Sequence, residues 1–161
     1  MSSRSDASAV RYREAGIADV PAMERCRATD RESGPADARM AAYLAGTHHP
    51  QQALAARVAF VALDGDDVIG YVASHATTRF GHDGEVQYLY VAPPYRRRGV
   101  ARQLLGLAAR WFVARQLHRV CVNADLESAG AVAFYEAQGA RSLNAHWYVW
   151  EDIGVLADAH S

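Results

Sequence analysis

The stretch LYVAPPYRRRGVARQLL, residues 89–105, joins an apolar segment to an amphipathic one through two prolines and a glycine. A β-strand is expected to end before Pro93 and Pro94, because proline has no N–H group for a sheet ladder. Gly99 then precedes the longest predicted helix, residues 100–117. The first N–H groups of a helix have no partner within the helix and lie at its positive end. This junction of strand, turn and helix is therefore typical of a phosphate site.

The three consecutive arginines of this turn fit the same interpretation. Arg96, Arg97 and Arg98 can donate charge-assisted hydrogen bonds to an anion. Gly99 lets the backbone approach the anion without a Cβ in the way, and Ala101 is nearly as small. A solvated charged turn or a nucleic-acid contact is the other interpretation. The formal net charge of −1 argues against nucleic acid, so we expect a ligand that carries a pyrophosphate.

Length and composition indicate one globular domain over residues 1–161, with a core from about residue 8 to residue 152 between a polar leader and a polar tail. All 17 basic residues are arginine, which excludes a lysine Schiff base and a Walker phosphate loop. Cys26 and Cys121 are far apart and outside any CxxC spacing, so a reducing, cytoplasmic setting is expected. The sequence shows no signal-peptide or membrane-spanning stretch, and its histidines lack paired metal-ligand spacing. We expect neither membrane association nor a metal.

Alternating and helical patterns predict strands and helices in mixed order. Asp19 is the candidate N-cap of the first helix, and Gly139 the left-handed cap of the last one. The expected strands are residues 9–16, the two arms of a hairpin at 57–76 with its turn at 64–67, and residues 85–91, 119–126 and 145–152. The expected helices are residues 18–32, 36–46, 100–117 and 128–140. Strand 85–91, helix 100–117 and strand 119–126 form a β-α-β unit, so the fold class is α/β (α+β) with a mixed sheet.

The motif Arg96-x-x-Gly99-x-Ala101 resembles the (Gln/Arg)-x-x-Gly-x-(Gly/Ala) signature of the GNAT superfamily of N-acetyltransferases. The chain also has VIGYV at residues 68–72 and AVAFYEAQGA at residues 131–140 in the family's order, so the resemblance covers roughly residues 58–150. It implies a GNAT-like fold, a central mixed and mostly antiparallel sheet of about six or seven strands flanked by about four helices. It also implies an acyltransferase that moves an acetyl group from acetyl-coenzyme A (acetyl-CoA) to a primary amine, by direct attack in a ternary complex.

The same resemblance assigns the coenzyme-binding residues. The main chain of residues 89–91 would hold the pantetheine and the thioester carbonyl, and the arginine turn would hold the pyrophosphate. Ser128 stands where many members have asparagine; it is also an ordinary helix N-cap residue, and Asn123 can compensate. The expected cofactor-binding residues are Leu89, Tyr90, Val91, Arg96, Arg97, Arg98, Gly99, Val100, Ala101, Ser128 and Tyr135.

Two residues are candidates for proton transfer. Tyr135 stands where the family commonly places a tyrosine whose hydroxyl reaches the coenzyme A sulfur, so it is the expected general acid; the alternative is a packed core tyrosine. Glu85 lies at the offset before Arg96 at which the histone-acetylating branch carries its glutamate, so it is the expected base, acting directly or through a water. The alternative for Glu85 is a solvated glutamate at a strand start. The weaker substitutes for the base are His82, Asp83 and His146.

The acceptor stays open. Asp30, Glu32 and Asp37 can attract a cationic amine, or they can simply form a solvated helix face. The aromatic strand with Trp147, Tyr148 and Trp150 can line an acceptor cleft or a dimer interface, but core packing is the expected role. A peptide N-terminus, an antibiotic amine, a polyamine and a small amino compound all fit, and homodimers are common in the family. The alternative functions are a non-catalytic acyl-CoA binding or sensing domain and, last, a nucleic-acid-binding domain.

Overall fold

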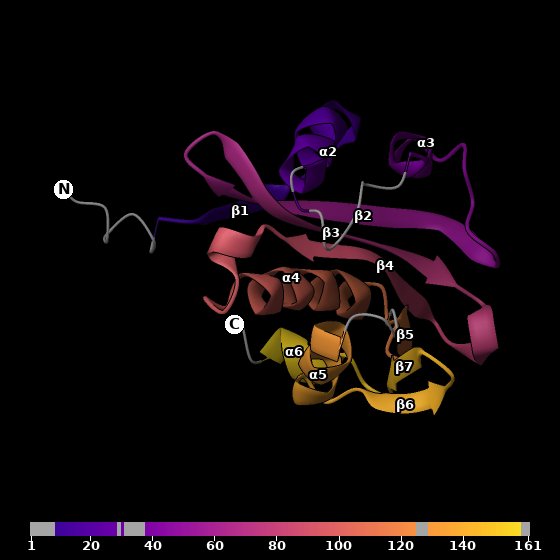
Figure 1. Cartoon of the computed structure of the whole chain (residues 1–161). Coiled ribbons are helices and arrows are strands. Elements are labelled where there is room, and N and C mark those ends of the chain that lie inside the picture. Colours follow the sequence, from indigo (N-terminus) through magenta and orange to yellow (C-terminus); the bar gives the residue numbers. More distant parts are fainter. Residues whose placement is uncertain (1–8, 29, 31–37, 125–128, 159–161) are drawn as a thin grey trace.

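A single mixed β-sheet runs through the chain in the computed structural model, which describes residues 9–28, 30, 38–124 and 129–158 (Figure 1). The sheet has seven strands in the order β1-β2-β3-β4-β5-β7-β6. The strands are β1 (Arg11–Glu14), β2 (Ala53–Asp64), β3 (Asp67–Thr77), β4 (Gly84–Val91), β5 (Val120–Asn123), β6 (Arg141–Asn144) and β7 (Trp147–Trp150). The helices are α2 (Val20–Ala28), α3 (Met40–Ala45), α4 (Val100–Ala114), α5 (Ala129–Ala137) and α6 (Gly154–Asp158), with short 3-10 turns η1 (Ile17–Asp19), η2 (Arg79–Gly81) and η3 (Pro93–Tyr95).

The topology agrees with the predicted fold class. Every neighbouring pair of strands is antiparallel except β4 and β5, which are parallel. Helix α4 connects these two strands, so the predicted β-α-β unit is confirmed. The hairpin of β2 and β3 is also confirmed, with Gly65 at positive φ in its turn.

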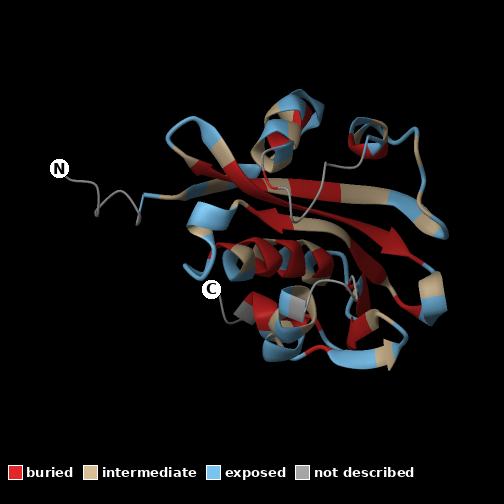
Figure 2. Cartoon of the chain, viewed as in Figure 1, coloured by how far each residue is buried: buried red, intermediate tan, exposed pale blue. Residues whose placement is uncertain are grey.

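Helices cover both faces of the sheet, and the buried residues lie between the layers (Figure 2). Helix α4 packs against β2, β3 and β4 and against α6, and α5 contributes to the same core. Helix α2 packs against β3 on the other face, where α3 contacts β2. The apolar spacing of α4 predicts one buried stripe of Val100, Leu104, Ala108 and the pair Trp111 and Phe112. All are buried except Trp111, which is half-buried.

A β-bulge interrupts the pairing of β3 with β4. Ala73 lies opposite Tyr88, whereas the next residue, Ser74, lies opposite Val86. Gln87 is therefore an extra residue on β4, and the alternation of side chains changes there.

The bulge determines the face of the sheet on which the Glu85 side chain lies. Glu85 lies opposite His75, and His75 contacts Tyr43 of α3. Tyr88 and Tyr90 pack against the same α2 and α3 layer. In a regular strand, an odd spacing would place Glu85 on the opposite face from both tyrosines.

Three local predictions differ from the structure. Asp19 lies directly before α2, where the N-cap was predicted, but its carboxylate accepts a hydrogen bond from the Gly16 N–H at 2.9 Å, and Gly16 is the N-cap of η1. Helix α2 ends at Ala28, earlier than the predicted residue 32; residues 29 and 31–37 lie outside the described part of the chain. Strand β6 was missed because it is a short, mostly exposed edge strand without an apolar pattern.

Candidate functional site

The β4–β5 pair separates part-way along its length. The two strands pair only from Gly84 to Val86 of β4, opposite residues 120–122 of β5. Strand β5 ends at Asn123, while β4 continues to Val91. The edge of β4 beyond Val86 therefore has no β5 partner, and its main-chain groups are available to an extended ligand.

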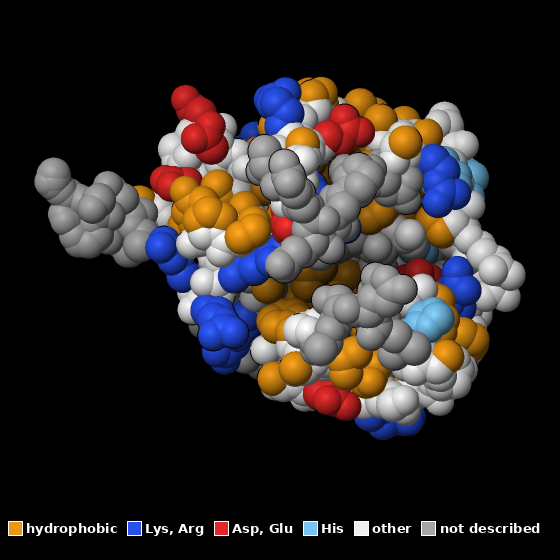
Figure 3. Space-filling view, viewed as in Figure 1, with side chains coloured by type: hydrophobic (Ala, Val, Ile, Leu, Met, Phe, Trp, Pro, Cys, Tyr) orange, Lys and Arg blue, Asp and Glu red, His pale blue; other side chains and the backbone are white. Residues whose placement is uncertain are grey.

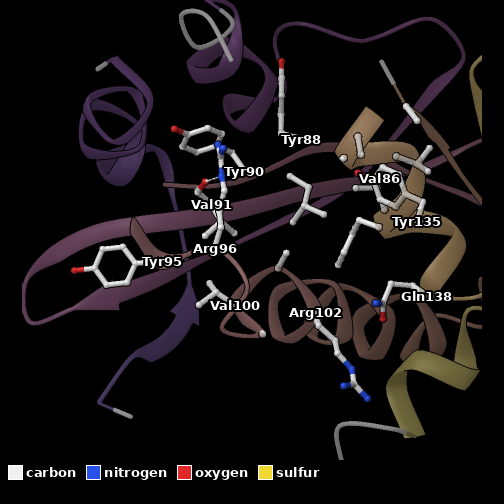
Figure 4. Close-up of a pocket in the computed structure, with 18 of the residues that line it drawn as sticks. Val86, Tyr88, Tyr90, Val91, Tyr95, Arg96, Val100, Arg102, Tyr135 and Gln138 are labelled. Carbon is white, nitrogen blue, oxygen red and sulfur yellow. Dashed lines mark hydrogen bonds between the residues drawn. The ribbon is translucent and has the colours of Figure 1, made fainter. Parts of the chain in front are cut away.

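A cleft of about 960 Å³ opens at this separation (Figures 3 and 4). Its walls come from residues 86–91 of β4, the turn and first residues of α4 between 95 and 102, residues 122–124 at the end of β5, and residues of α5 between 130 and 138. The predicted coenzyme-binding residues of β4 and of the α4 start therefore lie along one cavity. Ser128 lies outside the described residues, whereas Asn123 borders the cleft.

The start of α4 has the backbone of an anion site. Gly99 is the N-cap, with a left-handed φ of 82°, and Arg97 also has a positive φ of 63°. The first bond into the helix runs from the Gln103 N–H to the Gly99 carbonyl at 3.0 Å. Within the described residues, the N–H groups of residues 100–102 donate to no backbone carbonyl. Successive free N–H groups at a positive helix end bind phosphate.

The Arg96 side chain is occupied by protein groups. Its Nε donates to the Val91 carbonyl at 2.8 Å, and its Nη2 donates to Asp30 Oδ2 at 2.7 Å. The hydroxyl of Tyr90 donates to the same oxygen at 2.8 Å, and Figure 4 shows Arg96 beside Tyr90 and Val91. The Asp30 side chain is buried. The Arg96 side chain therefore links the turn to the end of β4, through Val91, and to the segment after α2, through Asp30.

The neighbouring arginines are placed differently. Arg97, like Arg96, borders the cleft, but Arg98 lies outside its lining, with its guanidinium 5.5 Å from the centre of the Tyr95 ring. Arg102, which the helical pattern predicts in solvent, is exposed and also borders the cleft. The sequence feature that could have identified Arg102 as a cleft residue is its position three residues after Gly99, on the first turn of the helix. Arg27 of α2 borders the cleft from the other side, with no motif in the sequence to mark it.

Tyr135 borders the cleft from α5 (Figure 4). Its side chain is buried and packs edge-on against Trp150 of β7. Burial raises the pKa of Tyr135 well above its ordinary value. The hydroxyl therefore keeps its proton at neutral pH, as a proton donor requires.

Gln87 is a cleft residue that the sequence did not mark. It lines the cavity, and its side-chain oxygen Oε1 is buried without a hydrogen-bond partner among the described residues. A buried amide oxygen without a donor costs free energy. Gln87 therefore presents an acceptor for an N–H group of a bound molecule.

Glu85 is buried, so the alternative of a solvated glutamate is wrong. It lies on β4 one residue before the cleft wall begins, and it is not itself part of the lining. Its Oε1 accepts a hydrogen bond from Arg79 Nε at 3.0 Å and lies 3.5 Å from His75 Nε2. The Arg79 guanidinium in turn lies 4.6 Å from the centre of the Trp147 ring.

The residues named as weaker substitutes for Glu85 have other contacts. His82 is buried, with its Nδ1 3.1 Å from the Phe80 carbonyl. The Asp83 carboxylate accepts the N–H groups of His118 and Arg119, at 3.1 and 3.0 Å, and so holds the start of β5. His146 stacks on the Trp147 ring.

The aromatic strand divides between the two faces of the sheet. Tyr148 and Trp150 belong to the core against α4, which confirms the expected packing role. Trp147 is half-buried and lies edge-on to Phe80 on the other face. Within the described ranges, no cluster of three or more potential metal ligands is found, and no helix is long and apolar enough to cross a membrane.

Comparison with known proteins identifies the family. The model of the acetyltransferase (GNAT) family matches residues 23–140, which is most of the chain. The chain belongs to the GNAT acetyltransferase family. The match includes most of α2, the separated strands and the arginine turn, so the cleft lies within the family region.

Solved structures share the GNAT fold. An acetyltransferase of the GNAT family from Desulfovibrio desulfuricans aligns with 89% of this chain and 99% of its own, at a TM-score of 0.72 and 18% identity. The PaiA N-acetyltransferase of Thermoplasma acidophilum, solved with coenzyme A, aligns over 87% and 96%, at a TM-score of 0.64 and 14% identity. The ribosomal-protein-S18-alanine N-acetyltransferase of Escherichia coli aligns over 84% and 79%, at a TM-score of 0.62 and 17% identity. A search of curated protein sequences finds no match.

Proposed function

We propose that this GNAT protein is an N-acetyltransferase that transfers the acetyl group of acetyl-CoA to a primary amine by direct attack in a ternary complex. One observation supports this above the others. The open N-terminus of α4, the unpaired edge of β4 and the Tyr135 side chain all border the same cleft. An anion site, an extended-chain site and a proton donor are the features that binding and using a coenzyme A thioester requires.

The cleft residues fit the parts of acetyl-CoA. The N–H groups of residues 100–102 and the side chains of Arg97 and Arg102 would hold the pyrophosphate. The main-chain groups of residues 87–91 on the edge away from β3, apart from the Val91 carbonyl that accepts Arg96 Nε, would hold the pantetheine as an added strand, with the Gln87 Oε1 accepting an amide N–H. PaiA, which shares the fold, was solved with coenzyme A.

When bound, acetyl-CoA supplies an activated acyl carbon. Attack by the neutral amine forms the C–N bond and breaks the C–S bond, so one proton must leave the nitrogen and one must reach the sulfur. Tyr135 would give its hydroxyl proton to the departing thiolate. The Glu85 carboxylate would accept the amine proton, directly or through a water, from the α2 and α3 face of β4.

A primary amine is the acceptor class that we propose. Proteins with the same fold include an enzyme named for the alanine of ribosomal protein S18 and an aminoglycoside acetyltransferase. The buried Glu85 beside the separation of β4 and β5 suits an acceptor that must lose a proton there.

Calorimetric titration with acetyl-CoA and with coenzyme A tests binding, and thiol release against a panel of amines tests transfer. We expect saturable binding of both and thiol release that depends on an amine. Binding without thiol release in the presence of any amine would show that the protein is an acyl-CoA binding domain and not an enzyme. No binding would overturn the assignment of the cleft.

A further inference from the structure

A chain of polar side chains crosses the apolar layer between α3 and the sheet. The Tyr43 hydroxyl lies 2.8 Å from His75 Nδ1, and His75 Nε2 lies 3.5 Å from Glu85 Oε1. Tyr43 and His75 have no exposed surface, and Glu85 is 3% exposed. Three polar residues in line in an apolar layer are costly unless each one is satisfied.

Among the described residues, His75 Nδ1 is the hydrogen-bond partner of the Tyr43 hydroxyl, so donation to Nδ1 is the direction that uses the hydroxyl hydrogen. Burial raises the pKa of Tyr43 far above its ordinary value, so the hydroxyl keeps its proton. Tyr43 can then donate to His75 Nδ1, which places the imidazole hydrogen of a neutral His75 on Nε2. Within the described residues, Nε2 has no hydrogen-bond partner, and the Glu85 carboxylate is the acceptor in front of it.

The position of Glu85 links this chain to the cleft. Glu85 is in the last paired segment of β4, and the strands separate immediately after Val86. The contacts of its carboxylate with described side chains fall on Oε1, from Arg79 and from His75. Oε2 is therefore the oxygen available to a bound amine or to a water.

We propose that His75 is a positioning residue that holds the Glu85 carboxylate for proton acceptance, and that Tyr43 fixes the tautomer in which it does so. This inference rests on the proposed acetyl transfer. The Arg79 Nε–H donates to Oε1 at 3.0 Å, and His75 Nε2 lies 3.5 Å from the same oxygen, so the two side chains confine Oε1 between them. A fixed carboxylate presents Oε2 in one direction, which is what a proton acceptor beside a reacting nitrogen needs.

Two substitutions separate the contacts of His75. His75→Asn keeps an amide near the position of Nδ1, toward Tyr43, but removes the donor toward Glu85. His75→Gln keeps a polar atom near the position of Nε2. With acetyl-CoA and the amine that the wild type uses best among benzylamine, spermidine and an alanine-initiated peptide, we expect His75→Asn to lower kcat about tenfold or more and His75→Gln to restore most of it. The Kd of coenzyme A should not change.

A double-mutant cycle with Glu85→Gln distinguishes positioning from a general structural role. If His75 acts through Glu85, His75→Asn causes no further loss of kcat in the Glu85→Gln background. The proposal would be overturned if the kcat losses of the two single variants multiplied in the double variant, or if His75→Asn also raised the Kd of coenzyme A.

The tautomer can be measured without an acceptor. In the ¹⁵N spectrum of the histidine rings, we expect a neutral Nε2–H ring for His75 in the wild type and a changed tautomer balance in Tyr43→Phe. A neutral Nδ1–H ring in the wild type would overturn the proposal whatever the kinetics. Thiol release from no amine, with coenzyme A still bound and the Nε2–H ring present, would instead refute the transfer reaction and make the arrangement a purely structural one.

Discussion

The Arg96 guanidinium and the Asp30 carboxylate form an ion pair at 2.7 Å that joins the arginine turn to the segment following α2. The two residues are 66 positions apart in the sequence. Asp30 is also the acceptor for Tyr90, so a single buried carboxylate connects the turn, β4 and the α2 side of the cleft.

We expect Arg96→Ala to destabilise the fold. It removes the donors to Val91 and Asp30 and leaves a buried carboxylate with less compensation. The loss should be about 1–2 kcal/mol, smaller than for a fully buried pair because the Arg96 side chain is partly exposed. Urea unfolding measures it, with Arg98→Ala as the control. Unchanged stability together with lost coenzyme A binding would show instead that Arg96 is a phosphate ligand.

Arg97→Ala and Arg102→Ala should each weaken coenzyme A binding by about threefold to tenfold, because both side chains border the cleft beside the open end of α4. The effect should shrink at high salt, since both side chains are exposed. Arg98→Ala should have a smaller effect, because Arg98 lies against Tyr95 outside the lining. Calorimetry at two salt concentrations provides the comparison. Equal losses for all three arginines would contradict this placement.

Gly99 tests the anion site by backbone conformation. Its φ of 82° disfavours a β-branched residue, whereas asparagine adopts left-handed backbone more readily. We expect Gly99→Val to weaken coenzyme A binding about tenfold or more, with a loss of about 1–3 kcal/mol in stability from backbone strain. Gly99→Asn should keep most of the stability, so its coenzyme A affinity isolates the effect of a side chain at the site. Normal affinity in Gly99→Val would refute the phosphate site.

Tyr135→Phe should lower kcat by about a hundredfold while the Kd of coenzyme A stays nearly unchanged, because only the hydroxyl is lost from a packed ring. If turnover is unaffected, the thiolate takes its proton from another group.

The pH profile follows from the same hydroxyl. Burial raises the pKa of Tyr135, so the protonated form that donates persists above the ordinary tyrosine range. We therefore expect no loss of kcat from this group until the pH exceeds about 10. The alkaline limb should disappear in Tyr135→Phe. If the kcat of the wild type fell with rising pH below about 10, and Tyr135→Phe abolished that fall, the argument from burial would be contradicted.

Much of the fold could be predicted from the sequence because its signals are local. Pro93 and Pro94 end β4, Gly99 begins α4, and the apolar spacing of α4 places it on the sheet. These local signals were enough to predict the β-α-β unit and the place where α4 begins. Strand β6 has no such signal, because it is polar and exposed at the sheet edge.

The side-chain partners in the site could not be predicted in the same way. The contact of Arg96 with Asp30 could not be predicted, because Asp30 lies 66 positions away in sequence and no local pattern joins the two residues. Glu85 looked like a solvated residue or a lone base, because its contacts with His75 and Arg79 depend on strand register and on the conformation of η2. Long-range pairing decides such contacts, whereas residue type and spacing decide the elements.

The bulge at Gln87 also affects how relatives of this chain should be aligned. Glu85 and Tyr90 face the same helices although an odd number of positions separates them. A relative that lacks the extra residue between Val86 and Tyr88 has a regular strand, in which an even spacing keeps the equivalent carboxylate on the face of α2 and α3 and brings it one position closer in sequence to the arginine turn. A fixed offset from the arginine turn therefore does not locate the equivalent of Glu85 in a relative without the bulge. Alignments of this strand should be judged by odd and even positions as well as by matched letters.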